Sequence, residues 1–204
     1  SLRFNPFSRK NWPLTLGRYD IQSKKVRDII IKLDNGGWEI GLHGSIRSYN
    51  DRNLLYREKK IIEEILGHEI IGTRQHWLNL QIPQTWKLHQ SLGLKYDCSF
   101  GLKYGIGYKE GIFHPFSPLK DDFLIFPLAI MDTFLFDLYP NYDDALRESL
   151  KVVECAKKNR GLLSILWHQR SFDETAFPFH SRLYQDLIER CLSEGAWFGT
   201  CAEL

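Results

Sequence analysis

Apolar and polar residues follow two alternating patterns along the chain. Stretches with an apolar residue every three or four positions, typical of helices with one buried face, alternate with short continuous apolar runs, typical of strands buried on both faces. The pattern predicts helices at about residues 21–34, 52–66, 83–93, 142–159 and 181–194, and strands at 38–42, 69–74, 94–98, 123–130, 162–168 and 196–201. Repeated strand–helix units favour a parallel sheet with helices outside it.

The number of predicted strands bears on the architecture. About six or seven parallel strands are expected, slightly few for a complete eight-stranded barrel. We therefore predict an α/β fold, a distorted or incomplete (β/α) barrel that forms a single domain over residues 1–204. Residues 99–121, rich in glycine, proline and aromatic residues, predict a long loop that shapes a site or is mobile.

Three histidines, His43, His76 and His168, each follow an apolar run. In parallel α/β folds the carboxyl ends of the strands carry the ligand and catalytic sites. Neutral imidazoles bind zinc and similar ions, and an open coordination position lets the ion activate water. An imidazole that does not bind the metal can deliver a proton to a leaving group. A lone histidine in a strand is more often structural, so the prediction depends on all three occupying equivalent strand ends.

Charged residues near these strand ends are further candidates. Arg74 lies two residues before His76, so on an extended strand both side chains point to the same side. Arg74 forms either a structural salt bridge or a contact that orients a carboxylate in the site. Asp132 follows the strand at 123–130, and either reaches the same face or caps a turn or helix. Asp97 is a weaker candidate of the same kind, whereas Asp51 most simply caps the next helix.

Several aromatic residues fall in or beside the candidate loops, among them Trp77, Trp167 and Tyr108. Such rings can form a platform for sugars, although most aromatic residues in a protein belong to its core. The glycines at 105, 107 and 111 do not form a dinucleotide-binding motif, because no clear strand precedes them and the third is one position late.

Composition narrows the range of functions. A hydrophobic content of 43% with 25% charged residues is typical of a folded, soluble protein. The net charge of +2 gives no electrostatic support for non-specific nucleic-acid binding. No apolar run approaches the ~18 residues that a membrane span needs. The four cysteines show no CxxC spacing, which favours a reduced compartment, and we expect a cytoplasmic protein. The sequence does not indicate an oligomeric state.

Three motifs and their order resemble the polysaccharide deacetylase family (NodB-like, carbohydrate esterase 4). They are WEIGLH at residues 38–43 with a helix that ends in ILG at 65–67, GTR at 72–74, and LWH at 166–168, which matches the family's L-x-H motif. Residues 195–198 resemble its last strand, and the likeness spans roughly residues 20–204. The resemblance implies a distorted (β/α) barrel, a divalent metal, usually zinc, and hydrolysis of N-acetyl groups on amino sugars.

The resemblance also implies roles for individual residues. His43 would be a metal ligand, His168 the general acid that protonates the departing amine, and Arg74 the residue that tunes the catalytic aspartate. Residues 1–20 contain only Asp20, so the family's Asp-Asp strand end, which supplies the base and one metal ligand, lies upstream of Ser1 or is missing. The family's second metal histidine falls at Arg47, and we expect His76 to replace it.

Two functions are therefore expected. The first is a metal-dependent hydrolase that removes N-acetyl or related acyl groups from amino sugars of a cell-surface polysaccharide or its precursor. The alternative is a non-catalytic carbohydrate-binding or assembly domain whose metal site has eroded. A third hypothesis is an unrelated barrel enzyme whose histidines do only acid–base chemistry.

Overall fold

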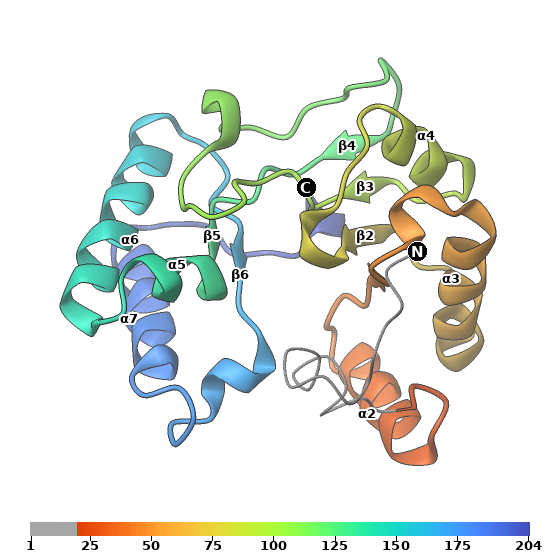
Figure 1. The fold of residues 1–204 in the computed structure, drawn as a ribbon, viewed down its shortest axis with the longest axis horizontal. Helices are drawn as coiled ribbons and strands as arrows, with labels where there is room; N and C mark the ends of the chain where they lie inside the picture. Colours follow the sequence, from red (N-terminus) through yellow and green to blue (C-terminus); the bar gives the residue numbers. More distant parts are fainter. Residues whose placement is uncertain (1–19) are drawn as a thin grey trace, which may run out of the picture.

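The structure, a computed structural model, describes residues 20–204. Helices and short strands alternate along most of the chain (Figure 1). The helices are α2 (Lys24–Asn35), α3 (Arg52–Leu66), α4 (Gln84–Ser91), α5 (Asp132–Leu138), α6 (Tyr142–Lys158) and α7 (His180–Ser193). The strands are β1 (Leu42–Gly44), β2 (Gly72–Gln75), β3 (Tyr96–Asp97), β4 (Leu124–Ile125), β5 (Ile130–Met131) and β6 (Ile165–Leu166).

The strands form two parallel sheets. One has the order β1-β2-β3-β4 and the other pairs β5 with β6. Every pairing within them is parallel. An isolated parallel bridge also joins Gly101, which follows β3, to Leu128, which lies between β4 and β5. Within residues 20–204 the strands do not close into a barrel. The predicted incomplete α/β fold is therefore confirmed.

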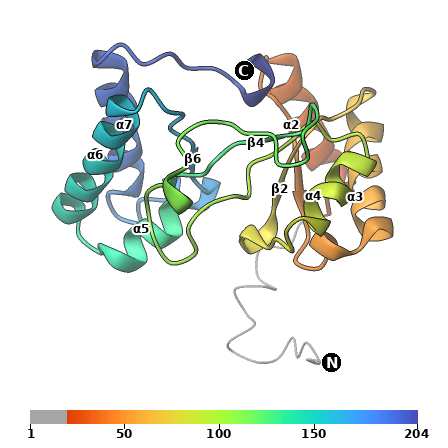
Figure 2. The same ribbon diagram turned by 90° about the horizontal axis from the view of Figure 1, so that it is seen from above.

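The helices divide into two groups (Figure 2). Helices α2, α3 and α4 lie beside the four-stranded sheet, and α5, α6 and α7 lie beside the two-stranded one. Between the sheets lies a compact apolar cluster, formed by Leu78, Leu128, Met131, Phe134 and Leu166. All its members except Leu128 stand within two residues of His76, Asp132 or His168, so this cluster packs the segments that carry the candidate residues against one another.

The predicted strand at 123–130 is wrong as a single element. The structure divides it into β4 and β5, which belong to different sheets. Pro127 lies between them and has no N–H, so it cannot continue a ladder of backbone hydrogen bonds. The run is apolar throughout because most of it is buried, and hydrophobicity alone does not show such a break.

Two further predictions are corrected at the level of elements, and one helix was not predicted. The strand expected at 38–42 begins only at Leu42, so His43 lies inside β1 and not after it. The strand expected at 196–201 is not formed; Cys201–Glu203 is one turn of 3-10 helix. Helix α5 was not predicted, because its seven residues are too few to show a helical period.

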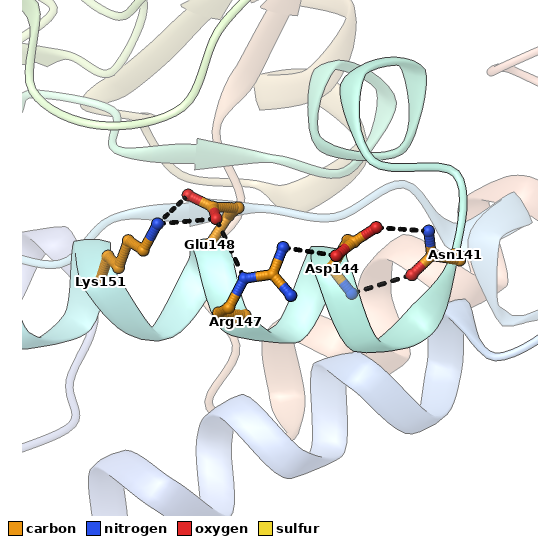
Figure 3. Close-up of polar contacts among 5 residues, drawn as sticks. All are labelled: Asn141, Asp144, Arg147, Glu148 and Lys151. Atoms are coloured by element: carbon orange, nitrogen blue, oxygen red, sulfur yellow. Dashed lines mark hydrogen bonds and ion pairs between the residues drawn. The ribbon is translucent and has the colours of Figure 1, made fainter.

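Side-chain caps fix the starts of two long helices. Asp51 accepts a hydrogen bond from the backbone N–H of Leu54 at 2.9 Å, as predicted, and starts α3. Asn141 caps α6 in the same way through the N–H of Asp144 at 2.9 Å. The exposed face of α6 then continues as a ladder of ion pairs from Asp144 through Arg147 and Glu148 to Lys151 (Figure 3). This face is a solvated surface of the fold.

In residues 20–204 no helix has both the length and the apolar character needed to cross a bilayer.

Candidate functional site

His43 and His76 form a hydrogen-bonded pair at the edge of the larger sheet. The register of β1 and β2 places His43 opposite Arg74, and His43 Nδ1 lies 3.0 Å from the Arg74 carbonyl oxygen. A carbonyl oxygen only accepts, so Nδ1 of His43 carries the proton and its Nε2 carries a lone pair. His76 Nδ1 lies 2.9 Å from that lone pair and must donate to it. The remaining nitrogen, His76 Nε2, is then also a lone-pair nitrogen.

The surroundings of this pair favour neutral imidazoles. Although part of His43 is open to solvent, burial lowers its pKa to about 4, helped by the charges of His76 and Arg74. Burial and the charge of His168 lower the pKa of His76 as well. Both rings are therefore uncharged near neutral pH, which is the form that binds metals and accepts protons.

His168 is held by a buried carboxylate. It follows β6, and its Nδ1 lies 2.6 Å from Asp132 Oδ1, while its backbone N–H donates to Asp132 Oδ2 at 2.9 Å. Asp132 is 1% exposed and also accepts from Ser171 Oγ at 2.5 Å and from the Thr133 N–H at 2.7 Å. With Nδ1 engaged, Nε2 is the nitrogen that remains for acid–base chemistry.

The environment of Asp132 keeps it ionised. Burial alone would raise its pKa, but the hydrogen bonds from His168 and Ser171 outweigh burial, and the pKa of Asp132 is lowered. Asp132 thus holds the ring of His168 by a hydrogen bond and is itself buried. Two placements were predicted for Asp132: the face that carries the histidines, or a cap of a turn or helix. The carboxylate contacts His168 and also accepts from the N–H of Thr133 in the first turn of α5, so it combines features of both.

The structure brings the three histidines to one face. His43 and His76 touch, with ring centroids 5.1 Å apart. The charge of His168 is near enough to lower the pKa of both His43 and His76. Two members of the apolar cluster, Leu78 and Leu166, each stand two residues from one of these histidines.

The side chain of Arg74 bonds the backbone after β3. Its Nε donates to the backbone carbonyl of Cys98 at 3.2 Å. Within residues 20–204 it forms no ion pair, and residues 1–19 contain no Asp or Glu that could supply one. The argument that Arg74 and His76 share a strand face also does not hold, since β2 ends at Gln75 and His76 begins a 3-10 turn. A role for Arg74 in catalysis stays a prediction.

Only one of the three predicted aromatic residues lies beside the histidines with its ring exposed. Trp77 is 52% exposed, and its ring centroid lies 6.4 Å from that of His76. Trp167 instead packs against Phe136 and Tyr184 at the edge of the core. Tyr108 packs against the same core cluster and donates its hydroxyl to the Leu162 carbonyl at 2.8 Å. The placement of Trp167 and Tyr108 does not support a sugar platform.

Sequence reasoning missed one feature of the site. Ser171 supports Asp132, but a serine three residues after a histidine carries no recognisable signal. Tyr104, another aromatic residue of the candidate loops, is 74% exposed and packs at a tilted angle against Phe134 of α5, with a left-handed backbone (φ 67°) that only its structure reveals. Asp97, a weak candidate, lies in the core instead, where it accepts from the indole of Trp86 at 3.1 Å.

The metal prediction fits these residues in part. His43 donates Nδ1–H to a backbone carbonyl, as metal-binding histidines commonly do, and its Nε2 lies 2.9 Å from His76 Nδ1, which carries the proton between the two rings. Catalytic zinc sites use three protein ligands. In the described part of the chain no group of three or more His, Cys, Asp or Glu side chains could hold a metal, and residues 1–19 contain none of these residue types. The donor set is thus one ligand short.

Solved structures share this architecture. The crystal structure of Puue allantoinase superposes with a TM-score of 0.63 at 19% identity, covering 88% of this chain and 62% of that one. A protein from Pseudomonas aeruginosa PAO1 described as a probable polysaccharide deacetylase gives a TM-score of 0.63 at 18% identity, with the same coverage. The chain has the NodB-like fold.

A third structure extends this likeness. A Bordetella bronchiseptica protein, described as a candidate polysaccharide deacetylase involved in O-antigen biosynthesis, gives a TM-score of 0.52 at 17% identity, covering 84% of this chain and 65% of that one. The chain thus spans about three fifths of the length of the NodB-like structures it matches. No protein-family model and no curated protein matches its sequence. At these identities the likeness establishes the fold alone.

Proposed function

We propose that this NodB-like domain is a deacetylase-type hydrolase that removes an N-acyl group from an amino sugar of a polysaccharide or its precursor. The observation that carries the proposal is the His168–Asp132 pair, joined at 2.6 Å, on the same face as two neutral imidazoles. Proteins of this fold described as polysaccharide deacetylases supply the substrate class.

His168 has the geometry of a general acid. Cleavage of an amide requires a proton at the departing amine nitrogen, and protonated His168 can donate it from Nε2. Asp132 holds Nδ1–H, which fixes the ring orientation and places a negative charge beside the imidazolium. Ser171 and the backbone of His168 keep that carboxylate in place.

The imidazole pair is proposed as part of a metal site. His43 Nε2 and His76 Nδ1 would hold a divalent ion, most simply zinc, once the proton that His76 Nδ1 donates to His43 Nε2 has moved to His76 Nε2. When bound, such an ion polarises the acyl carbonyl and lowers the pKa of its water. Because the chain supplies two of the usual three ligands, this half of the proposal requires a direct test.

Metal content and turnover can be measured on the same variants. We expect His43→Ala and His76→Ala to lose zinc after loading and dialysis, measured by elemental analysis. His168→Ala should retain zinc and lose acetate release from N-acetylglucosamine oligosaccharides by about 100-fold or more. His114→Ala is the matched control, since His114 lies on an exposed loop and no contact joins it to the three histidines. Equal zinc retention in all variants would overturn the assignment of the ligands.

A second function is favoured by a specific observation. Within residues 20–204 the donor set lacks a third ligand, and the carboxylate that contacts His168, Asp132, is fully engaged with His168 and its neighbours. A non-catalytic carbohydrate-binding domain would show saturable oligosaccharide binding without zinc retention or acetate release. Trp77→Ala should then weaken that binding, because the exposed ring is the natural platform for a sugar.

A further inference from the structure

Basic residues lie in the same chain segments as the three histidines. Within four residues of a histidine stand Arg47 after β1, Arg74 on β2 and Arg170 after β6. Arg170 is exposed and lies 3.4 Å from Thr133 Oγ1, beside Asp132. Each of these cations therefore lies in a segment that also carries a residue of the site.

Lys103 adds a fourth positive charge from the long loop after β3. Its Nζ donates to Asn79 Oδ1 at 3.0 Å, and Asn79 Nδ2 in turn lies 3.4 Å from the Ile46 carbonyl, next to Arg47. Asn79 follows the turn that carries His76 and Trp77. This chain of contacts ties the Lys103 loop to the segments after β1 and β2.

Nearby carboxylates do not neutralise these charges. Three carboxylates lie near the histidines, and each accepts hydrogen bonds from other groups. Asp132 accepts from His168 and Ser171, Glu58 from the Ser45 N–H, and Glu39 from the Tyr96 hydroxyl and the Ala202 N–H. Within residues 20–204, none of the four cations forms an ion pair. The ion pairs that arginine and lysine do form there lie on the helices α2, α3, α6 and α7 or at their ends. Residues 1–19 contain no acidic residue, so the chain itself offers no other partner.

Exposed aromatic rings accompany these charges. Tyr104 follows Lys103, and Trp77 follows His76; both rings are more than half exposed, and both residues have left-handed backbone angles (φ 67° and 58°). For residues other than glycine this conformation is strained, and strain of this kind often accompanies ligand sites. A sugar face stacks on such rings, and an anionic substituent pairs with arginine or lysine beside them.

We propose that the substrate is an acidic glycan: an acylated amino sugar that carries a phosphate or carboxylate group, bound by Lys103 and Arg170 with Trp77 and Tyr104 against the sugar ring. This inference rests on the proposed function, whose amino-sugar substrate it specifies. Phosphate and carboxylate share the chemistry that arginine and lysine recognise, and the choice of probe distinguishes them.

Calorimetric titration of the full chain tests the inference without requiring turnover. The probes are N-acetylglucosamine, its 1-phosphate and N-acetylmuramic acid, which carries a carboxylate. We expect the two acidic sugars to bind more tightly than the neutral one, with the difference falling as salt is added. Lys103→Gln and Arg170→Gln should each weaken the acidic sugars about tenfold and leave the neutral sugar unchanged. The preferred acidic probe identifies the anionic group.

Two controls keep the test decisive. Arg147→Gln removes a cation of α6 that is already paired with Asp144 and should change nothing. Equal binding of neutral and acidic sugars, or equal losses in Arg147→Gln and Arg170→Gln, would overturn the acidic-glycan inference while leaving the proposed hydrolase intact. If no sugar binds but pyrophosphate does, and Arg170→Gln abolishes its binding, the anion site stands and the proposed function fails. Failure of pyrophosphate and all sugars to bind overturns both.

Discussion

At the scale of single residues, Asp132 links the stability of the protein to the orientation of His168. It accepts hydrogen bonds from His168, Ser171 and Thr133 while 1% exposed. We expect Asp132→Asn to lose about 3 kcal/mol of unfolding free energy near pH 7. The NH2 group of the asparagine would face the hydrogen-bond donors that now surround the carboxylate, and in this buried site no water can separate them. Turnover should fall as well, since His168 loses its fixed ring orientation.

The pH dependence of that loss follows from the lowered pKa of Asp132. A carboxyl with a folded pKa below its unfolded value of about 3.9 stabilises the fold fully above that value and loses the contribution as pH falls through the folded pKa. The difference between wild type and Asp132→Asn should thus be largest near neutral pH and shrink below about pH 4. Urea unfolding at several pH values measures it. A difference between wild type and Asp132→Asn that grows in acid would contradict this account.

Ser171→Ala, which removes one hydrogen-bond donor to Asp132, should lower the unfolding free energy by about 1 kcal/mol.

Residue-level prediction succeeded where a local pattern carries the information. Asp51 is a cap because it directly precedes a helical period, and each of the three histidines lies within two residues of the carboxyl end of a strand. Trp167 and Tyr108 were misplaced because an aromatic residue beside a loop faces either solvent or core, and only the packing of α6 and α7 decides between them. The pairing of Asp132 with His168 spans 36 positions, a separation that no local pattern encodes.

At the scale of elements, the close packing of β2 against β3 requires glycine at position 72. A Cβ on Gly72 would overlap the ring of Tyr96, whose hydroxyl bonds Glu39. Gly72→Ala should lower the unfolding free energy by about 1–3 kcal/mol, because the buried tyrosine must move. The matched control is Gly105→Ala, whose Cβ meets Leu102 at an ordinary 3.4 Å. Thermal unfolding of the two variants measures the difference, and equal melting temperatures would refute the packing argument.

The long helices could be predicted and the strands less well. Helices α3, α6 and α7 agree with the predicted ranges to within one residue at each end, because each has a continuous buried stripe. The strands have only two to four paired residues, so apolar runs overestimate them. The division between β4 and β5 depends on which sheet each half joins, and that is a property of the tertiary structure.

At the scale of the whole molecule, the C-terminal segment connects the two helix groups. It runs from α7 across to the larger sheet (Figure 2), where the Ala202 N–H donates to Glu39 at 3.0 Å. Cys201 then lies with its Sγ 3.7 Å from Sγ of Cys98, just after β3. Both thiols are free, and Cys98 also supplies the carbonyl that holds Arg74. A covalent link between these thiols would fix the segment against the sheet.

We expect hydrogen peroxide to form that link. The hydrogen bond from Cys98, aided by the charge of Arg74, lowers the pKa of the partly exposed Cys201 thiol, while that hydrogen bond and burial raise the pKa of Cys98. Cys201 thiolate therefore reacts first to give a sulfenic acid, and Cys98 displaces water from it to complete the disulfide. Closing a loop of 103 residues should raise the melting temperature by about 10 °C.

Mass spectrometry and thermal unfolding together decide whether this link forms. The intact mass should fall by about 2 Da as two thiol hydrogens leave, and Cys201→Ser should abolish both this change and the thermal shift. The variant with Cys155→Ser and Cys191→Ser should retain both, because those thiols lie on α6 and α7. A disulfide that includes Cys155, or oxidation to single sulfinic acids without a cross-link, would show that the C-terminal segment does not rest against β3 in solution. A cross-link without a thermal shift would show that the segment is already as firmly held by Glu39 as by a covalent bond.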